Sequence, residues 1–350
     1  LKTSALSAIE FALAPKAVKA FLGFAALMNG RLFKGNMHFQ ALGTSFRIWS
    51  DGIVSPLFEE LDSTCKLIAK EYDDVDGRRE LLNDPEFIQQ FRDDWHHGRG
   101  ENDLASIKAR LGMPDVVVPR DFGIMTFDGA PITEWDGETF QQVYNRLEAY
   151  QRGQADQARS DAERDAFDKF PRPIRDDADF MLHMMREYDK GFRYWVDVAN
   201  VGNKATLDLL LHKHTLPGFN DSGAHITNMA FFDANLNSLK LAQQKSLETV
   251  STIVKRLTSE PAAFFGLDVG TLELGDQADI TMIDPEALRD WDDLSGRELI
   301  YRELFEHQQM VSRSDGVVTH TFINGEAVWR NGDHTEALGT KTLGRALRAA

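Results

Sequence analysis

Residues 214–225 read His214-Thr-Leu-Pro-Gly-Phe-Asn-Asp221-Ser-Gly-Ala-His225. The apolar start of this stretch is typical of a short strand, and its polar, glycine-containing end places Asp221 just after the strand. In barrels of alternating strands and helices, catalytic groups gather at the carboxyl ends of the strands. Because Asp-Ser-Gly is also favourable turn chemistry, two interpretations stay open: Asp221 is a catalytic carboxylate or the cap of a turn. Ser222 lacks the glycine two residues to each side that a nucleophile elbow needs.

The sequence around this stretch alternates between helical and strand patterns. A helical apolar face ends at Asn29-Gly30, and a strand pattern covers residues 36–42. Alternating apolar residues predict another strand at 194–198, and Ser246 is placed to cap an amphipathic helix that follows it. Helices and strands that alternate in this way predict an α/β fold.

Two long polar stretches interrupt this alternation, at about 56–113 and 134–180. Excursions of such length between strands are usually functional lids or cap elements. The charges in the second stretch alternate in sign, which is typical of a solvated helix and not of a binding tail. We therefore expect two lid insertions that close over a site.

The pattern changes again after residue 266, where only short strands are predicted. They lie at 271–272, 280–283, 317–323 and 327–329. Asn324-Gly325 between the last two is a strong hairpin signal, since both turn positions need positive φ. We therefore predict one domain over residues 1–266 and a small appended antiparallel β unit over 267–350.

Composition and charge argue against several classes of partner. The 350 residues include 39 Lys and Arg against 55 Asp and Glu, a formal net charge of −16. That charge repels phosphate backbones and anionic lipid, so we expect neither a nucleic-acid nor a membrane partner. Cys65 is the single cysteine, which excludes an internal disulfide and a cysteine-rich zinc site. The apolar run 21–28 is too short to span a bilayer, and we expect a cytoplasmic protein.

Several motifs resemble those of one enzyme family. The stretch 215–225 resembles the last-strand motif of the amidohydrolase superfamily, in its N-acyl-D-amino-acid deacylase (D-aminoacylase-like) branch. Residues 257–267, 270–280 and 320–328 are similar to later segments of that family. The resemblance is specific over residues 200–350. It implies a metal-dependent hydrolase of amide bonds, built as part of a (β/α)8 TIM-type barrel.

The resemblance also implies roles for particular residues. Asp221 would bind a metal ion, accept a proton from the attacking water and deliver it to the leaving amine. Lys2 and His225 would contact the substrate, an N-acylated amino acid whose D configuration the branch suggests. In the family, a metal-binding histidine is commonly followed by Leu-Lys, and this sequence begins Leu1-Lys2. We therefore expect a C-terminal fragment, with most ligands of one or two zinc ions upstream of Leu1.

Two other functions stay open. A cyclic amidase or dihydroorotase-like hydrolase would share Asp221, and a non-catalytic scaffold would lack the metal ligands. His212 with His214 is a further candidate ligand pair, although both fall in a predicted turn. His96 with His97 is another, which we interpret as solvated lid surface, because adjacent helical residues face different ways.

Overall fold

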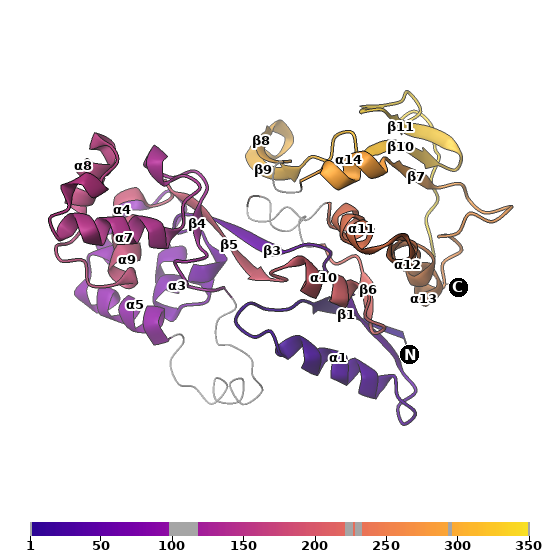
Figure 1. The fold of residues 1–350 in the computed structure, drawn as a ribbon, viewed down its shortest axis with the longest axis horizontal. Coiled ribbons are helices and arrows are strands. Elements are labelled where there is room, and N and C mark those ends of the chain that lie inside the picture. Colours follow the sequence, from indigo (N-terminus) through magenta and orange to yellow (C-terminus); the bar gives the residue numbers. More distant parts are fainter. Residues whose placement is uncertain (1, 98–117, 221–226, 228–232, 293–295, 349–350) are drawn as a thin grey trace. The chain divides into compact units, whose positions relative to one another are not determined.

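The computed structural model describes residues 2–97, 118–220, 227, 233–292 and 296–348 (Figure 1). The chain forms two compact units. The sheet unit contains Leu1–Glu10, Val18–Ser45 and Asn200–Ala350, and the insert unit contains Phe11–Ala17 and Phe46–Ala199. The residue ranges of both predicted lids belong to the insert unit. The predicted domain boundary after residue 266 stays a prediction.

Three parallel strands form the centre of the sheet unit, in the order β1-β2-β6. They are β1 (Lys2–Ala8), β2 (Asn36–Ala41) and β6 (Thr215–Pro217). Ala8 pairs with Ala41 and Ala41 with Pro217, so the strands end together at one edge, which we call the carboxyl edge. The predicted mixed α/β class is confirmed. Within the described residues these three strands form an open sheet and no closed barrel.

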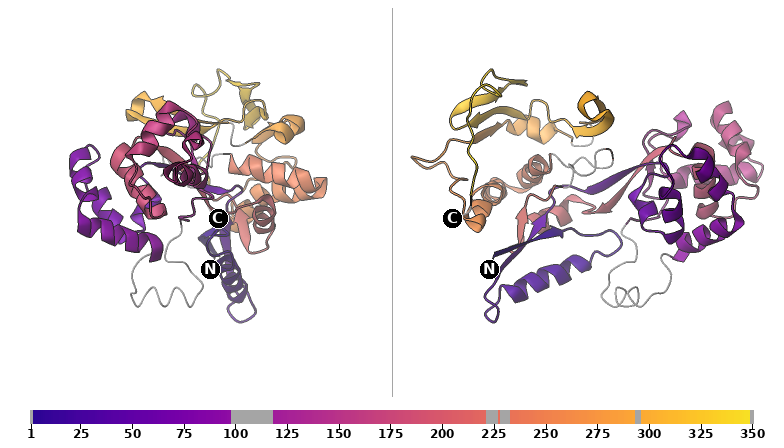
Figure 2. Two further views of the ribbon diagram at one scale, coloured as in Figure 1. Left: turned by 60° about the vertical axis from the view of Figure 1, so that its left-hand side comes forward. Right: turned by 180° about the vertical axis from the view of Figure 1, so that it is seen from behind.

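Helix α1 (Ala17–Met28) lies along this sheet (Figure 2). Val18 and Ala25 on its inner side share a core with Phe39 of β2 and with Leu209. This packing explains the helical spacing of the apolar residues. The helix stops before Asn29-Gly30, as the sequence predicts.

Within the described residues, five helices of the sheet unit lie just before β6 or after it in the sequence. They are α10 (Asn203–Leu210), α11 (Ala234–Lys245), α12 (Leu247–Leu257), α13 (Ser259–Phe265) and α14 (Pro285–Asp290). Leu210, Ile253 and Trp291 lie together in a second core. Ser246 caps α12 as predicted, because its side chain accepts a hydrogen bond from the Thr249 N–H at 3.1 Å.

The tail contains an antiparallel sheet in the order β12-β11-β10-β7. Its strands are β7 (Ile280–Ile283), β10 (Val318–Ile323), β11 (Glu326–Arg330) and β12 (Asp333–His334). Asn324 and Gly325 join β10 to β11 with φ of 51° and 80°, so the predicted hairpin is confirmed. The strand predicted at 271–272 is wrong, because the Thr271 hydroxyl instead bonds to Asp276 within a turn.

A second hairpin in the tail has no counterpart among the predicted strands. It pairs β8 (Arg297–Arg302) with β9 (His307–Ser312), joined by a short 3-10 helix at Glu303–Phe305. Leu299, Tyr301 and Phe305 are exposed here. The sequence of β8, Arg-Glu-Leu-Ile-Tyr-Arg, also lacks the alternation of apolar and polar residues that would mark a half-buried strand.

The insert unit combines a small antiparallel sheet with helices. The sheet has the order β3-β5-β4, from β3 (Phe46–Asp51), β5 (Arg193–Ala199) and β4 (Thr126–Phe127). The α-helices are α2 (Pro56–Glu59), α3 (Asp62–Ile68), α4 (Val75–Leu82), α5 (Pro85–His97), α7 (Phe140–Gln151), α8 (Asp161–Lys169) and α9 (Asp177–Tyr188). Thr133–Trp135 and Ala155–Gln157 are 3-10 helices. Among the helices of the described residues, none has both the length and the apolar character of a membrane-spanning segment.

The core of the insert unit contains a buried histidine. His183 of α9 is 5% exposed, and its ring packs against Phe170 at a centroid distance of 3.8 Å. Its Nε2 has no hydrogen-bond partner among the described residues. Burial lowers the pKa of His183 from 6.5 to about 4. Between these values the unfolded chain binds a proton that the folded chain does not, so stability falls as the pH drops below 6.5 and the loss levels off below 4.

We expect His183→Phe to reduce this pH dependence. Phenylalanine keeps a ring against Phe170 but takes up no proton, so the loss of unfolding free energy between pH 7 and pH 5 should shrink by about 2 kcal/mol. Urea unfolding at pH 7 and at pH 5 measures this loss of unfolding free energy. Replacing the exposed His307 with Gln is the control and should change nothing. The same pH dependence in His183→Phe as in the unsubstituted chain would contradict the prediction.

Candidate functional site

Asp221, the strongest catalytic candidate from the sequence, comes shortly after the end of β6 along the chain. Asp221 and His225 lie outside the described residues, so their roles stay predictions. The described chain leads up to them: the N–H groups of Gly218 and Phe219 both donate to the Ala41 carbonyl, at 3.2 and 3.3 Å. Gly218 has φ of 120°, a conformation that favours glycine. The chain therefore leaves β6 at this edge, where parallel-strand folds place their functional groups.

Lys2 lies at the other end of the sheet. It is exposed at the start of β1 and pairs with Asn36, the first residue of β2. Ala8, which lies at the carboxyl edge, is six residues further along the strand, or roughly 20 Å at the usual strand rise. The structure therefore does not bring Lys2 to the carboxyl edge, and its contact with substrate stays a prediction.

Asn200 organises the carboxyl edge, and the sequence reasoning missed it. Its side chain is fully buried and makes three hydrogen bonds. Oδ1 accepts from the Glu10 N–H at 2.9 Å, while Nδ2 donates to the carbonyls of Leu42 and Thr44 at 3.3 and 3.2 Å. Glu10 follows β1, and Leu42 and Thr44 follow β2. One amide therefore ties together the segments that leave two neighbouring strands.

The backbone of Asn200 adds to this arrangement. Its N–H donates to the Glu10 carbonyl at 2.8 Å, and its own carbonyl accepts from the hydroxyls of Ser45 and Thr206 at 3.2 and 3.4 Å. The residue has φ of 54°, which asparagine tolerates better than most residues. An asparagine close to Gly202 is a turn signal. From this signal a turn could be predicted at Asn200, but the partners of its hydrogen bonds could not.

Gly43 allows a close approach of α11 to the same edge. A Cβ at this position would lie 2.0 Å from the Ser238 hydroxyl oxygen and 2.3 Å from the Ala234 carbonyl oxygen. The Gly43 carbonyl also accepts from Nδ2 of Asn237 at 2.8 Å. The segment after β2 is thus fixed on two sides, by Asn200 and by α11. Such a preorganised backbone is a suitable support for catalytic groups.

The described residues of the carboxyl edge do not make up a metal site by themselves. They are Glu10, residues 42–45, Asn200 and residues 218–220, and they include no histidine or cysteine. Within the described residues, one group of potential ligands comes close together, His96 with Asp176 and Asp177. That group belongs to the insert unit.

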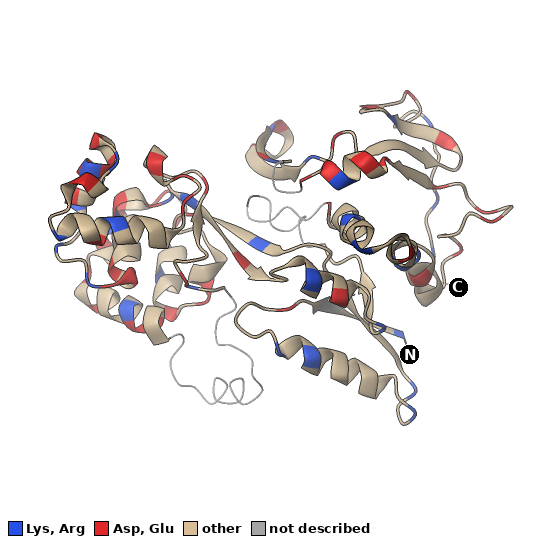
Figure 3. Ribbon diagram, in the orientation of Figure 1, with Lys and Arg blue, Asp and Glu red and all other residues tan. Residues whose placement is uncertain are grey.

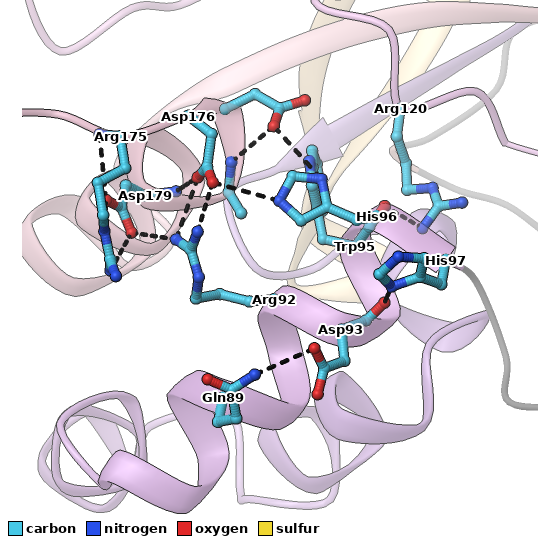
Figure 4. A network of polar contacts seen from close by, with 12 residues as sticks. Gln89, Arg92, Asp93, Trp95, His96, His97, Arg120, Arg175, Asp176 and Asp179 are labelled. Carbon is cyan, nitrogen blue, oxygen red and sulfur yellow. Dashed lines mark hydrogen bonds and ion pairs between the residues drawn. The ribbon is translucent and has the colours of Figure 1, made fainter.

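An ion-pair network already engages this group (Figure 4). Arg92 of α5 makes two hydrogen bonds to the Asp176 carboxylate and a further one to Asp179. The Asp179 N–H also donates to Asp176, at 3.0 Å. Although burial raises the pKa of Asp176, these hydrogen bonds outweigh it and hold that pKa below its ordinary value. His96 Nε2 lies 3.4 Å from Asp176, and its Nδ1 lies 3.9 Å from Asp177.

This geometry favours a structural role over metal binding. Both oxygens of Asp176 already accept charged or backbone donors, and the guanidinium of Arg92 would repel a cation. Asp176 also caps α9, so the network fastens α5 to the start of α9. His97 lies outside this ion-pair network. Its Nδ1 is 3.1 Å from the Asp93 carbonyl oxygen.

The pair His212 and His214 lies before β6, at the amino end of the sheet. Their ring centroids are 5.6 Å apart. Nδ1 of His214 lies 3.1 Å from Nδ2 of Asn29, and Nδ1 of His212 accepts from the His214 N–H. Burial and the neighbouring Lys213 lower the pKa of both. No third ligand from the described residues joins them, which favours the turn interpretation.

Part of the chain is similar to a known protein family. Residues 217–328 match the family model described as the amidohydrolase family. The match begins on Pro217, the last residue of β6, and extends into β11. It spans Asp221 and His225. The amidohydrolase match thus covers the segment that leaves the carboxyl edge and most of the tail sheet.

Individual curated proteins are similar to this chain over shorter or longer stretches. Uncharacterized proteins of Mycobacterium tuberculosis and Mycobacterium bovis are each 29% identical over 326 residues, covering 91% of this chain and 46% of theirs. The chain thus spans about half the length of these curated relatives. A dihydroorotase of Geotalea daltonii is 33% identical over 91 residues, which is 26% of this chain and 20% of that protein.

Solved structures of D-aminoacylase are similar at a low level. One, described as defining a novel subset of amidohydrolases, is 17% identical with a TM-score of 0.31, covering 65% of this chain and 38% of its own. Another, concerned with the binuclear metal centre of D-aminoacylase, is 14% identical with a TM-score of 0.32, covering 94% of this chain and 66% of its own. Likeness at this level carries no structural argument.

Proposed function

We propose that this chain is part of a hydrolase that cleaves the amide bond of N-acyl amino acids, in particular of the D configuration. The observation that carries the proposal is the amidohydrolase match over residues 217–328, which includes Asp221 and His225. The motif resemblance to the N-acyl-D-amino-acid deacylase branch supports the choice of substrate. The fixed backbone at the carboxyl edge is consistent with a catalytic group that follows it.

In the proposed reaction Asp221 moves the proton. Its carboxylate accepts a proton from the water that attacks the amide carbonyl, and then delivers that proton to the leaving amine as the C–N bond breaks. The products are a carboxylate and a free amino acid. His225 is proposed to contact the substrate, since a histidine near a carboxylate is readily recruited for hydrogen bonding.

Metal dependence is a separate proposal. Because the described carboxyl-edge residues include no histidine or cysteine, a zinc ion bound there would need ligands outside them. Elemental analysis of the protein as it is produced in the cell tests this. We expect zinc at near-stoichiometric amounts. A protein without a bound divalent metal would instead favour the non-catalytic scaffold.

A cyclic amidase is the second candidate, because part of the chain matches a dihydroorotase. Assays of amine release from N-acetyl-D- and N-acetyl-L-amino acids, beside ring opening of dihydroorotate, separate the two. We expect release from the D series. Turnover of dihydroorotate alone would replace the proposed substrate class, and no turnover in any assay would argue against a hydrolase.

A further inference from the structure

Helix α1 and the turn after it carry an apolar surface that faces away from the core. Phe24 and Leu27 are 50% and 56% exposed, and Leu32 and Phe33 of the turn are 81% and 53% exposed. Single exposed apolar side chains are ordinary. Four large ones so close in sequence are not, since α1 already makes its core with β2 through other residues. We call these four residues, with Arg31 and Lys34, the α1-tip patch.

The charged residues next to the patch in the sequence are all positive. Residues 11–50 contain five basic residues and no Asp or Glu, in a chain whose net charge is −16. Figure 3 shows basic and no acidic residues along α1 and its turn. Arg31 and Lys34 flank the apolar pair Leu32 and Phe33, and all four are exposed. Within the described residues, neither Arg31 nor Lys34 makes an ion pair.

The turn that displays this pair is fixed at its base. The Asn29 side chain accepts from the Met37 N–H at 2.6 Å and donates to the Met37 carbonyl at 2.7 Å. The Gly35 N–H donates to the Met28 carbonyl at 2.9 Å, and a Cβ on Gly35 would lie 2.8 Å from that oxygen. Turns are normally polar. Here a well-bonded turn holds two large apolar side chains in the open, which points to an occupant.

A second copy of this chain is a poor occupant. Antiparallel packing of α1 on its copy would bring Lys19 towards the other copy's Arg31 and Lys34, and parallel packing would bring like residues together. Like charges at an interface cost free energy. A protein partner would need apolar side chains and acids arranged to match this turn. A fluid lipid surface needs no such arrangement.

We propose that the α1-tip patch docks this protein on an anionic lipid surface. Leu32 and Phe33 enter the boundary between headgroups and acyl chains, while Arg31 and Lys34 contact anionic headgroups. The expectation of no membrane partner used the net charge, which averages over the whole chain. Charges further away than a Debye length of about 8 Å are screened, so the local positive charge decides. This inference does not depend on the proposed hydrolase activity.

Vesicle co-sedimentation of the full chain tests the proposal. We expect binding to phosphatidylcholine vesicles that contain phosphatidylserine, weaker binding without phosphatidylserine, and weakening as the salt concentration rises. Arg31→Gln with Lys34→Gln should lower the partition constant roughly thirtyfold. Leu32→Ser with Phe33→Ser should lower it roughly a hundredfold. All four residues are exposed, so the variants should fold, which their circular dichroism checks.

The matched control is Leu272→Ser with Leu274→Ser. These leucines are also exposed, but they flank Glu273 and lie near Asp276. Their replacement should leave vesicle binding unchanged. The proposal is overturned if phosphatidylserine has no effect, if binding persists in both patch variants, or if the control variant loses it equally. Self-association that the Leu32 and Phe33 substitutions abolish, without vesicle binding, would identify a second copy as the occupant instead.

Discussion

Replacement of Asp221 with asparagine is expected to lower the turnover of an N-acyl-D-amino acid by roughly 10²–10⁴-fold. Asparagine has nearly the same size and shape as aspartate, but it cannot accept a proton from the attacking water or pass one to the leaving amine. The effect should appear in kcat, because the proton is transferred during the reaction and not on binding. The measurement is steady-state amine release by the protein as it is produced in the cell.

Ser222→Ala is the matched control for this experiment. It alters the next residue, removes a hydroxyl, and should leave kcat unchanged if Ser222 is no nucleophile. A loss in Ser222→Ala with none in Asp221→Asn would point to a serine hydrolase. Unchanged turnover in Asp221→Asn, with the same metal content as the unsubstituted protein, would remove Asp221 from the mechanism.

The elements that depend on neighbouring residues were predictable from the sequence. The end of α1 follows from Asn29-Gly30, the start of α12 from the Ser246 cap, and the β10–β11 hairpin from Asn324-Gly325. Each of these signals acts through a hydrogen bond or a backbone angle within a few residues. Local chemistry is therefore enough to place them.

Contacts between distant parts of the chain carry no such signal. The Asn200 side chain meets Glu10 across 190 positions, and Arg92 meets Asp176 across 84. Nothing near Asn200 in sequence shows which carbonyls its amide will bind. The pairing of Lys2 with Asn36 likewise joins β1 to a strand more than thirty positions further along the chain, and no residue near Lys2 indicates that partner.

Charge gives a further case in which the average hides the local structure. The net charge of −16 describes the whole chain. It does not show that residues 11–50, which contain no acid, include a helix with an exposed apolar side. The sequence contains both facts, but only the fold shows that Leu32 and Phe33 are displayed between Arg31 and Lys34. The candidate site itself still depends on Asp221, which the sequence motif predicts.

Replacement of Asn200 with alanine is expected to lower the unfolding free energy by roughly 3–5 kcal/mol. The substitution withdraws the partner of the half-buried Glu10 N–H and of the carbonyls of Leu42 and Thr44 in buried residues, and each buried group left without a hydrogen bond costs about 1–3 kcal/mol. Alanine at φ of 54° adds about 1–2 kcal/mol of backbone strain. Urea unfolding of the chain measures the change.

Two further variants separate the loss of hydrogen bonds from the backbone strain. Asn200→Gly fits the positive φ and should recover about 1 kcal/mol relative to alanine, because only the hydrogen bonds are lost. Asn203→Ala changes an exposed asparagine three residues on and should stay within about 0.5 kcal/mol of the unsubstituted chain. If Asn200→Ala costs less than about 1 kcal/mol, the amide does not hold the two strand ends together. The carboxyl edge would then be fixed chiefly by the close packing of Gly43 on α11, and any effect of Asn200 substitutions on catalysis would need another explanation.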